Sequence, residues 1–334
     1  MDRPFKVLSI DGGGIRGIIP ALVLTDIERR TGRPISSLFD LIAGTSTGGI
    51  IALGVTKPNE QGEPAYRADE IVDLYAKRGK RIFSSPLMHQ LSSAWGLLDE
   101  KYAAEEVEKV FDDYFGEARL KDALTNVLVT SFEIELRSPW FFRSNRARTE
   151  PDRDFPMKKV ARATSAAPTY FEPLKLEGVG QDKDWALVDG GVYANNPTMC
   201  ALVDARTVFG ADDVLVVSLG TGEPTAGIPW KDAKDWGLVG WARPLLDIVF
   251  EGVSDTVAFQ AEQLCPAVDG KRRYYRFQVQ IPELKTAIDD IDDARDATIE
   301  ALRHLAENLI RERDAELDEL CAALTAEPSA AAGV

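Results

Sequence analysis

Three short apolar stretches of this chain each run directly into a glycine-rich turn, and this pattern constrains the fold more than any other feature. The stretches are FKVLSI, LFDLIAG and DWALVD, at residues 5–10, 38–44 and 184–189. Segments with helical periodicity follow the first two, at residues 18–32 and 47–56. A buried strand that turns on glycine into a helix is typical of a parallel sheet covered on both faces. We therefore predict a three-layer α/β/α fold with a mostly parallel central sheet.

The rest of the chain continues this alternation and then becomes less regular. We expect further strands at residues 124–135, 140–144, 213–222 and 273–281, and further helices at residues 66–80, 103–116, 154–168, 197–210 and 295–324. The periodicity weakens after about residue 230, and the small residues of the C-terminal tail predict frayed ends. We expect a catalytic core over residues 1–225 and a C-terminal elaboration over residues 226–334 that packs on the same domain.

Charge and hydropathy exclude several classes of function. The 334 residues carry a formal net charge of −15, which disfavours binding to nucleic-acid polymers and general attraction to anionic membranes. No segment has the roughly 18–20 apolar residues of a membrane span, and the first apolar run is too short for a signal peptide. Cys200, Cys265 and Cys321 show neither disulfide nor metal-ligand spacing. We expect a cytoplasmic protein without a metal or cofactor.

The first glycine loop has two interpretations. GGGIRG, at residues 12–17, matches the G-x-G-x-x-G pattern of dinucleotide-binding proteins between a strand and a helix. That pattern also requires an acidic residue at the end of the second strand, whereas Asp40 lies at its start. A dinucleotide-dependent oxidoreductase is therefore retained as an alternative of another class. The same glycines can expose backbone N–H groups at a helix N-terminus, where they stabilise an oxyanion.

The second loop carries a serine in a reactive context. GTSTG, at residues 44–48, matches the G-x-S-x-G pattern in which a nucleophilic serine occupies a sharp strand-to-helix turn. A phosphate-binding P-loop is excluded because Ile50 and Ile51 stand where lysine and serine or threonine are required. The competing interpretation is that Ser46 caps the helix that starts at Thr47.

A nucleophilic serine needs a base, and the sequence offers few candidates. His89 and His304 are the two histidines of the chain, and neither follows a predicted strand. Asp189 does follow one, so the sheet topology should bring it to the same edge as Ser46. The unperturbed pKa of aspartate, about 3.9, makes it a weak base that relies on proximity and on a strong oxyanion site. A turn-forming aspartate is the competing interpretation of Asp189.

These motifs together resemble the patatin-like phospholipase family over about residues 5–225. The resemblance rests on five segments in family order: DGGGIRG, GTSTG, ARATSAAPTYF, DGG and SLGTG, at residues 11–17, 44–48, 161–171, 189–191 and 218–222. The family motifs are intact at each of these positions. A patatin-like α/β hydrolase that cleaves acyl esters of phospholipids through an acyl-enzyme is therefore expected.

The resemblance also implies roles for individual residues. Ser46 would be the nucleophile and Asp189 the base of a Ser–Asp dyad that needs no metal. The oxyanion loop would comprise Gly12, Gly13, Gly14 and Arg16, with the N–H groups of Gly13 and Gly14 as donors and Arg16 ordering the loop. General esterase activity, or hydrolysis of galactolipids or monoacyl lipids, are alternatives within the same class. A lipid-binding protein with an inactive site is a further alternative.

Several segments bear on substrate access and control. Residues 228–250 hold three tryptophans, and residues 85–98 are a second flap candidate, which would allow transient contact of this cytoplasmic protein with the inner membrane. Basic clusters at residues 142–148 and 271–276 could meet an anionic ligand. Bacterial patatin-like proteins include antiphage effectors switched on by cyclic nucleotides, which suggests such an activator and homo-oligomer assembly here. The acidic run at residues 289–296 lacks the glycine turn of a calcium loop.

Overall fold

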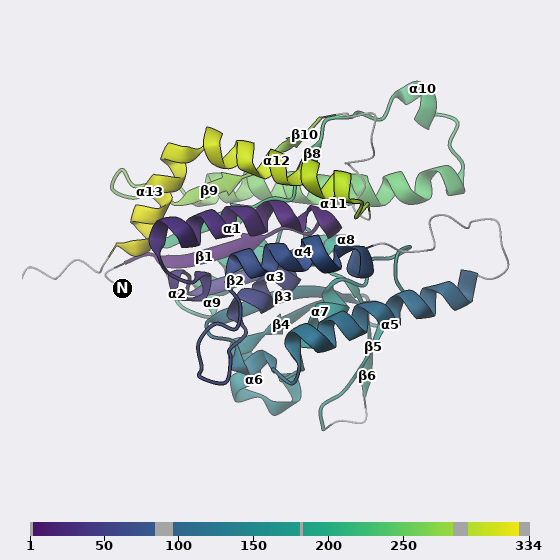
Figure 1. Ribbon diagram of the computed structural model, residues 1–334, viewed down its shortest axis with the longest axis horizontal. Helices are drawn as coiled ribbons and strands as arrows, with labels where there is room; N and C mark the ends of the chain where they lie inside the picture. The colour runs from purple at the N-terminus through teal and green to yellow at the C-terminus, as the bar shows by residue number, and fades with distance from the viewer. Residues whose placement is uncertain (1–2, 84–95, 181–182, 283–292, 327–334) are drawn as a thin grey trace, which may run out of the picture.

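The computed structural model describes residues 3–83, 96–180, 183–282 and 293–326, and it places one large sheet between two layers of helices (Figure 1). The strands of the large sheet are β1 Phe5–Ile10, β2 Leu41–Thr45, β3 Asn126–Glu133, β4 Ser138–Arg143, β5 Leu174–Glu177, β6 Asp184–Asp189, β7 Val214–Leu219 and β9 Tyr274–Phe277; β8 Glu223–Pro224 and β10 Gln280–Ile281 pair with each other separately.

The helices precede, connect and follow these strands. They are α1 Ile18–Thr31, α2 Ile35–Leu38, α3 Thr47–Thr56, α4 Ala68–Phe83, α5 Gly96–Phe115, α6 Ser144–Thr149, α7 Met157–Thr164, α8 Gly191–Ala194, α9 Thr198–Thr207, α10 Trp230–Ala233, α11 Leu238–Leu264, α12 Asp296–Glu312 and α13 Asp314–Thr325, with short 3-10 turns at η1 Gly14–Gly17, η3 Leu120–Asp122 and η4 Pro151–Arg153. The predicted three-layer α/β/α class is confirmed.

The sheet has a parallel part and an antiparallel part. Strands β3, β2, β1, β7 and β9 lie side by side in that order and run parallel, while β4, β5 and β6 make antiparallel pairs. Strand β4 occupies one edge of β3 along residues 128–133. Both β2 and β6 must therefore pair with the opposite edge of β3. There β2 ends opposite Thr130 and β6, running the other way, ends opposite Ser131, so the two strands meet end to end.

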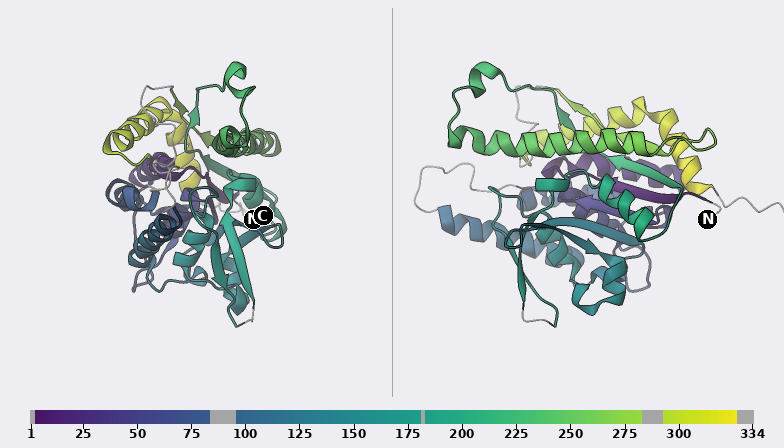
Figure 2. Two further views of the ribbon diagram at one scale, coloured as in Figure 1. Left: turned by 90° about the vertical axis from the view of Figure 1, so that its right-hand side faces the viewer. Right: turned by 180° about the vertical axis from the view of Figure 1, so that it is seen from behind.

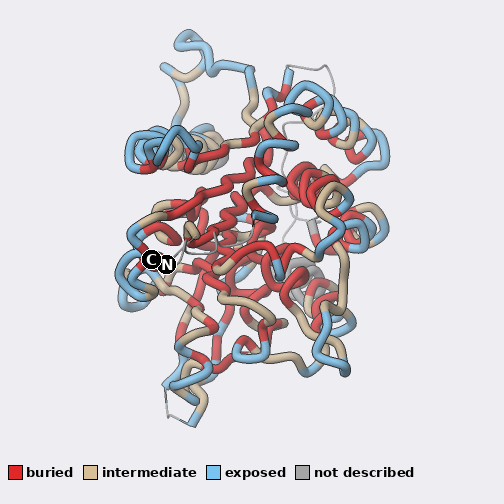
Figure 3. Tube along the Cα trace, turned by 90° about the vertical axis from the view of Figure 1, so that its left-hand side faces the viewer, coloured by how far each residue is buried: buried red, intermediate tan, exposed pale blue. Residues whose placement is uncertain are grey.

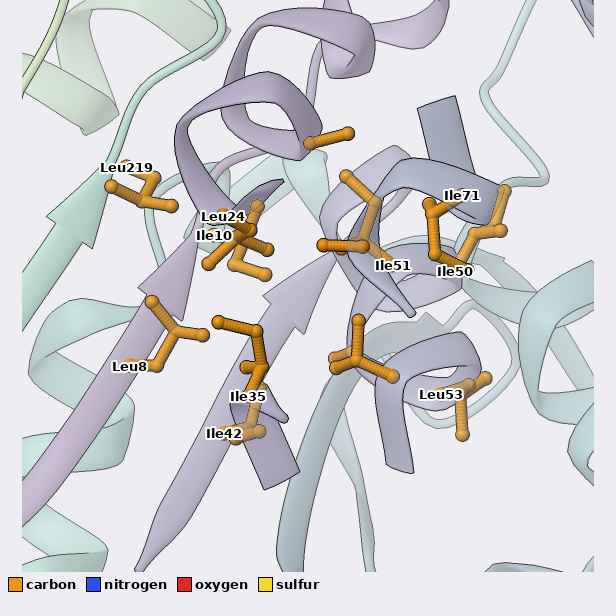
Figure 4. Packing of buried hydrophobic residues seen from close by; sticks show 14 of the residues in the cluster. Leu8, Ile10, Leu24, Ile35, Ile42, Ile50, Ile51, Leu53, Ile71 and Leu219 are labelled. Atoms are coloured by element: carbon orange, nitrogen blue, oxygen red, sulfur yellow. The ribbon is translucent and has the colours of Figure 1, made fainter. Parts of the chain in front are cut away.

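Each face of the sheet is covered by its own apolar cluster, which explains why the central strands are buried throughout. Leu8 and Ile10 of β1 pack with α1 and α3 (Figure 4), while Phe5 and Val7 pack on the other face with α9 and α11. Figure 3 shows the resulting buried centre beneath more exposed outer helices. Successive side chains of a strand point to opposite faces, so covering both faces removes the apolar–polar alternation of a half-exposed strand.

Two expectations about the C-terminal part are wrong in detail, and one helix there was not expected. The single helix expected over residues 295–324 is two helices, α12 and α13, because the chain bends at Arg313 and both helices then reach α1. The single strand expected over residues 273–281 is divided between β9 and β10, which belong to different sheets. The long helix α11 was not expected, since Pro244 and two glycines interrupt its sequence pattern. The predicted fraying of residues 327–334 lies outside the described residues.

Candidate active site

Ser46 stands on a tight turn between β2 and α3. Its backbone has φ 54° and ψ −122°, a conformation that side-chain-bearing residues adopt rarely and that is a mark of strained functional sites. The turn depends on its glycines: a Cβ on Gly44 would lie 2.2 Å from the carbonyl oxygen of Gly48, and one on Gly48 would lie 2.1 Å from that of Ile10. Ser46 makes no side-chain capping hydrogen bond to α3, so its hydroxyl is not used as a helix cap.

Two hydrogen bonds hold this turn against its neighbours. The Ser46 N–H donates to the hydroxyl oxygen of Thr164 at 2.8 Å, and the Thr164 hydroxyl donates to the carbonyl oxygen of Thr130 at 2.7 Å. Thr164 is the last residue of α7, which belongs to the segment flagged in the sequence at residues 161–171. This segment therefore fixes the backbone of Ser46 and leaves its side chain to face Asp189.

Asp189 approaches Ser46 from the opposite direction along the sheet. Thr45 pairs with Thr130 of β3, and Asp189 pairs with the next residue, Ser131, on the same edge. Asp189 lies at the sheet edge where Ser46 lies, as predicted, but not because β6 runs parallel to the other strands. Strand β6 is antiparallel to β3, so its carboxyl end arrives at the site because β3 extends past the end of β2.

The Asp189 carboxylate is buried, with 2% of the residue exposed. It lines the same pocket as Ser46 and interacts with the Ser46 hydroxyl, and it accepts a hydrogen bond at 2.7 Å from the N–H of Gly191. Burial raises the pKa of Asp189 to about 7, and the Ser46 hydroxyl and the Gly191 N–H oppose that shift without cancelling it. A carboxylate with a pKa near neutrality is a much stronger base than an ordinary aspartate and is matched to proton transfer at physiological pH.

The first glycine loop lies beside Ser46. A Cβ on Gly12 would come within 3.3 Å of the Ser46 Cβ, and one on Gly13 would lie 2.3 Å from the Thr221 hydroxyl. Gly14 has φ +56°, in the left-handed region that favours glycine. The Gly12 N–H donates to the carbonyl oxygen of Asn195 at 2.9 Å. No hydrogen bond within the described residues engages the N–H groups of Gly13 and Gly14.

Arg16 and the preceding aspartate have different surroundings. Arg16 is 8% exposed on η1 and interacts electrostatically with Glu251 of α11. Asp11, at the end of β1, accepts a 2.6 Å hydrogen bond from Nη2 of Arg276 on β9. This ion pair could not be predicted, because nothing in the sequence connects Asp11 to a residue 265 positions later.

A small pocket opens on the serine and the aspartate. It has a volume of about 40 Å³, and its lining is apolar apart from a few polar groups that include Ser46, Asp189 and Asn195. Gly13 and Gly14 also line this pocket. His304 does not contribute; it lies on α12, largely exposed, beside Glu300 and Glu307. His89 lies outside the described residues, as does most of the flap candidate at residues 85–98.

The structure assigns internal partners to the basic clusters. In the cluster at residues 142–148, Arg143 pairs with Asp204, Arg146 pairs with Glu150 and Arg148 donates to backbone carbonyls. In the cluster at residues 271–276, Arg272 pairs with Glu316, Arg273 with Asp213 and Arg276 with Asp11. These six guanidinium groups therefore already have partners within the chain.

The acid that a dinucleotide site would need lies elsewhere. Asp40 precedes β2 and accepts hydrogen bonds from Arg3 and from the N–H of Lys6. This is the amino edge of the parallel strands, whereas the glycine loops follow their carboxyl ends. Most of the acidic run at residues 289–296 lies outside the described residues.

Large apolar side chains are exposed on the segment that carries α10 and on one side of α11. They include Ile228, Trp230, Trp241, Leu245 and Ile248, and Trp230 is 77% exposed. The α10 segment projects from the body of the molecule in Figures 1 and 2. Within the described residues, no helix combines the length and apolar character needed to cross a membrane.

Comparison with known proteins identifies the family. The model of the patatin-like phospholipase family matches residues 8–202. The chain is 31% identical, over 91% of its length, to Patatin-like protein 4 of Arabidopsis thaliana, and it covers 82% of that protein. The chain therefore belongs to the patatin-like phospholipase family, as the sequence motifs predicted, and this membership supports a lipid acyl hydrolase activity.

Three further comparisons do not add support for a particular activity of this chain. The chain is 32% identical, over 93% of its length, to Probable inactive patatin-3-Kuras 1 of Solanum tuberosum, covering 87% of it. Among solved structures, VipD from Legionella pneumophila is 13% identical to this chain with a TM-score of 0.38, and the match covers 93% of this chain and 67% of VipD. The type III effector ExoU is 12% identical with a TM-score of 0.32, and the match covers 93% of this chain and 53% of ExoU. These TM-scores are too low to support an argument.

Proposed function

We propose that this protein is a serine lipid acyl hydrolase of phospholipase A type, with Ser46 as nucleophile and Asp189 as general base. The observation that carries the proposal is that Ser46, on its strained turn, lines one pocket together with a buried carboxylate, Asp189, whose pKa is raised to about 7. A serine on a strained elbow with a matched base in reach is the arrangement that nucleophilic catalysis requires. General esterase activity, or hydrolysis of galactolipids or monoacyl lipids, would use the same groups.

The proposed reaction has two halves. In the first, Ser46 Oγ attacks the acyl carbon while its proton moves to Asp189, and the proton then passes to the leaving lipid alcohol as the acyl-enzyme forms. In the second, Asp189 takes a proton from water, whose oxygen attacks the acyl carbon. The proton returns to Ser46 Oγ as the fatty acid leaves. Both halves pass through a tetrahedral oxyanion.

The oxyanion would be stabilised by the glycine loop. The N–H groups of Gly13 and Gly14 are unengaged within the described residues and border the pocket that holds Ser46. The Gly12 N–H is committed to Asn195, so in this proposal Gly12 contributes close approach rather than a donor. The buried side chain of Arg16 would order the same loop. Donors fixed in advance stabilise developing charge without having to reorganise during the reaction.

Access to lipid would come through the exposed apolar side chains of α10 and α11. Trp230 projects from the body of the molecule, and Ile228 and Ile248 border a second pocket beside the active site. Tryptophan and aliphatic side chains at such a rim suit transient insertion into a membrane interface. The protein would then act peripherally at the inner membrane.

Activation by a cyclic nucleotide, a role in antiphage defence and homo-oligomer assembly stay predictions from the family resemblance. The two basic clusters that suggested an anionic activator are already paired within the chain. A panel of cyclic nucleotides in a lipase assay tests the idea, and a panel in which no member raises the rate would contradict it.

The direct test of the proposed function is hydrolysis of phospholipid vesicles by the protein and by Ser46→Ala. The wild-type protein should release fatty acid and lysolipid, and the variant should lose activity by about 10⁴-fold or more. Ser37→Ala, which changes an exposed serine of α2, is the matched control and should behave like the wild type. Lipid hydrolysis that survives in Ser46→Ala would contradict the mechanism. The same mixtures report membrane contact, for which a blue shift of tryptophan fluorescence is expected.

A further inference from the structure

A second and larger pocket adjoins the active site. It has a volume of about 280 Å³ and shares Asn195 and Phe250 with the pocket that holds Ser46. Helix α11 forms one wall, and the segment from Thr221 to Ile228 forms another. The two pockets are therefore neighbours that share part of their lining.

The charge of this pocket is strongly one-sided. Its lining contains five carboxylates and one guanidinium: Asp11, Glu223, Asp247, Glu251, Asp255 and Arg16. The pKa of Glu251 is raised by burial and by Asp247, Asp255 and Glu223, against an opposing effect of Arg16. The pKa of Asp255 is raised by burial and by Glu223, against an opposing effect of Arg276. Carboxylates therefore outnumber the cations around this pocket.

An unsatisfied atom at the base of the pocket points to a missing partner. Asp11 is 2% exposed and lines the pocket, and Arg276 occupies its Oδ2 atom. Its Oδ1 atom is buried and has no hydrogen-bond partner within the described residues. A buried carboxylate oxygen without a donor is costly, and such atoms in a folded protein call for an explanation.

We propose that this acidic pocket binds the ammonium group of the substrate headgroup, so that the enzyme selects phospholipids with an amine headgroup over anionic phospholipids. This inference rests on the proposed function and names its substrate class. An ammonium group adds positive charge to a lining in which carboxylates outnumber cations, and charge-assisted hydrogen bonds to carboxylates are among the stronger polar contacts.

Other occupants fit the same space less well. A nucleotide or an anionic headgroup would bring phosphate charge against the excess of carboxylates without an ammonium group to offset it, which costs electrostatic energy. Within the described residues, no group of three or more His, Cys, Asp or Glu side chains is arranged to hold a metal ion. An organic cation needs no such coordination sphere, and the apolar side chains of Ile228, Ile248 and Phe250 in the lining suit its carbon atoms.

The inference is tested by competition within one membrane. Vesicles contain equal amounts of phosphatidylethanolamine and phosphatidylglycerol with different acyl chains, and mass spectrometry measures the ratio of the two lysolipid products. Because both lipids share one surface, changes in membrane binding or in the amount of enzyme cancel in that ratio. The variant Glu251→Gln with Asp255→Asn removes two charges from the α11 wall. Glu262→Gln, at an exposed position of the same helix outside the pocket lining, is the matched control.

The wild-type protein is expected to favour phosphatidylethanolamine, and the double variant should lower the product ratio by about tenfold, as expected for a lost charge-assisted contact. Glu262→Gln should keep the wild-type ratio. Two results would overturn this inference alone, provided that the wild type cleaves both lipids. Either the double variant leaves the product ratio unchanged, or Glu262→Gln lowers the ratio equally. A wild-type protein that cleaves neither lipid, although a fluorophosphonate labels its Ser46, would overturn the proposed function and this inference with it.

Discussion

Two aspartates of this protein occupy nearly the same local sequence and the same depth, yet they have different partners. Asp11 follows β1 and Asp189 ends β6, each is followed by at least two glycines, and each is 2% exposed. Asp11 faces the guanidinium of Arg276 at 2.6 Å. Asp189 faces the hydroxyl of Ser46 and the N–H of Gly191, and none of the influences on its pKa is a nearby cation.

The comparison shows how surroundings divide a structural carboxylate from a reactive one. Burial raises the pKa of both groups, and Arg276 opposes that effect at Asp11 without cancelling it. At Asp189 no cation opposes burial, and the pKa is raised to about 7. The cost of a buried carboxylate is therefore offset in part by an ion pair at Asp11, whereas at Asp189 it appears as increased basicity.

The largest expected effect is a loss of activity when the carboxylate of Asp189 is removed. Asp189→Asn should lower kcat for ester hydrolysis by about 10³-fold, because the amide keeps the shape of the side chain but cannot accept the Ser46 proton. Steady-state kinetics on a fluorogenic ester measures this loss. Asp184→Asn, at the exposed start of the same strand, should stay within about twofold of the wild type. A comparable loss in Asp184→Asn would show that the effect comes from disturbing β6.

The second expected effect separates the two aspartates by stability. Asp11→Asn removes the carboxylate that neutralises Arg276 and leaves a buried cation without its counter-charge, which should lower the free energy of unfolding by about 3 kcal/mol. Chemical denaturation at pH 8 measures the change. A loss below about 1 kcal/mol would mean that the Asp11–Arg276 pair does not have the structural role assigned here.

The third effect is smaller and has the opposite sign. The pKa of Asp189 is higher in the folded protein than in the unfolded chain, so its contribution to stability falls as the pH rises from about 4 to 7. Asp189→Asn should therefore raise the free energy of unfolding at pH 8, where the native carboxylate is charged, by about 2 kcal/mol more than at pH 5. At pH 5 the native group is protonated and the gain should largely disappear. An equal gain at both pH values would contradict the raised pKa.

The sequence predicts the parallel half of the fold and the loops that form the candidate site for a clear reason. Strand, turn and helix are adjacent in the chain there, so glycine spacing and apolar periodicity record local structure directly. The elbow at Ser46 and the loop at residues 12–17 are local features of this kind.

Features that depend on distant contacts could not be predicted in the same way. The position of β6 at the end of β2 depends on how far β3 extends beyond β2, and the partner of Asp11 comes from β9, far along the chain. Helix α11 could not be predicted, because Pro244 and the two glycines within it locally indicate helix breaks. The pKa of Asp189 depends on burial, which motif spacing does not report.

The central claim, that Asp189 activates Ser46, is tested most directly by the pH dependence of Ser46 labelling with a fluorophosphonate. The second-order rate constant, followed by intact mass between pH 5 and 9, needs no assumption about the lipid substrate. For the wild type it should rise about tenfold per pH unit until pH 7 and then level off. For Asp189→Asn it should be about 10³-fold lower and show no inflection near pH 7. Labelling of Asp189→Asn at the wild-type rate, or an unchanged inflection near pH 7, would contradict the account.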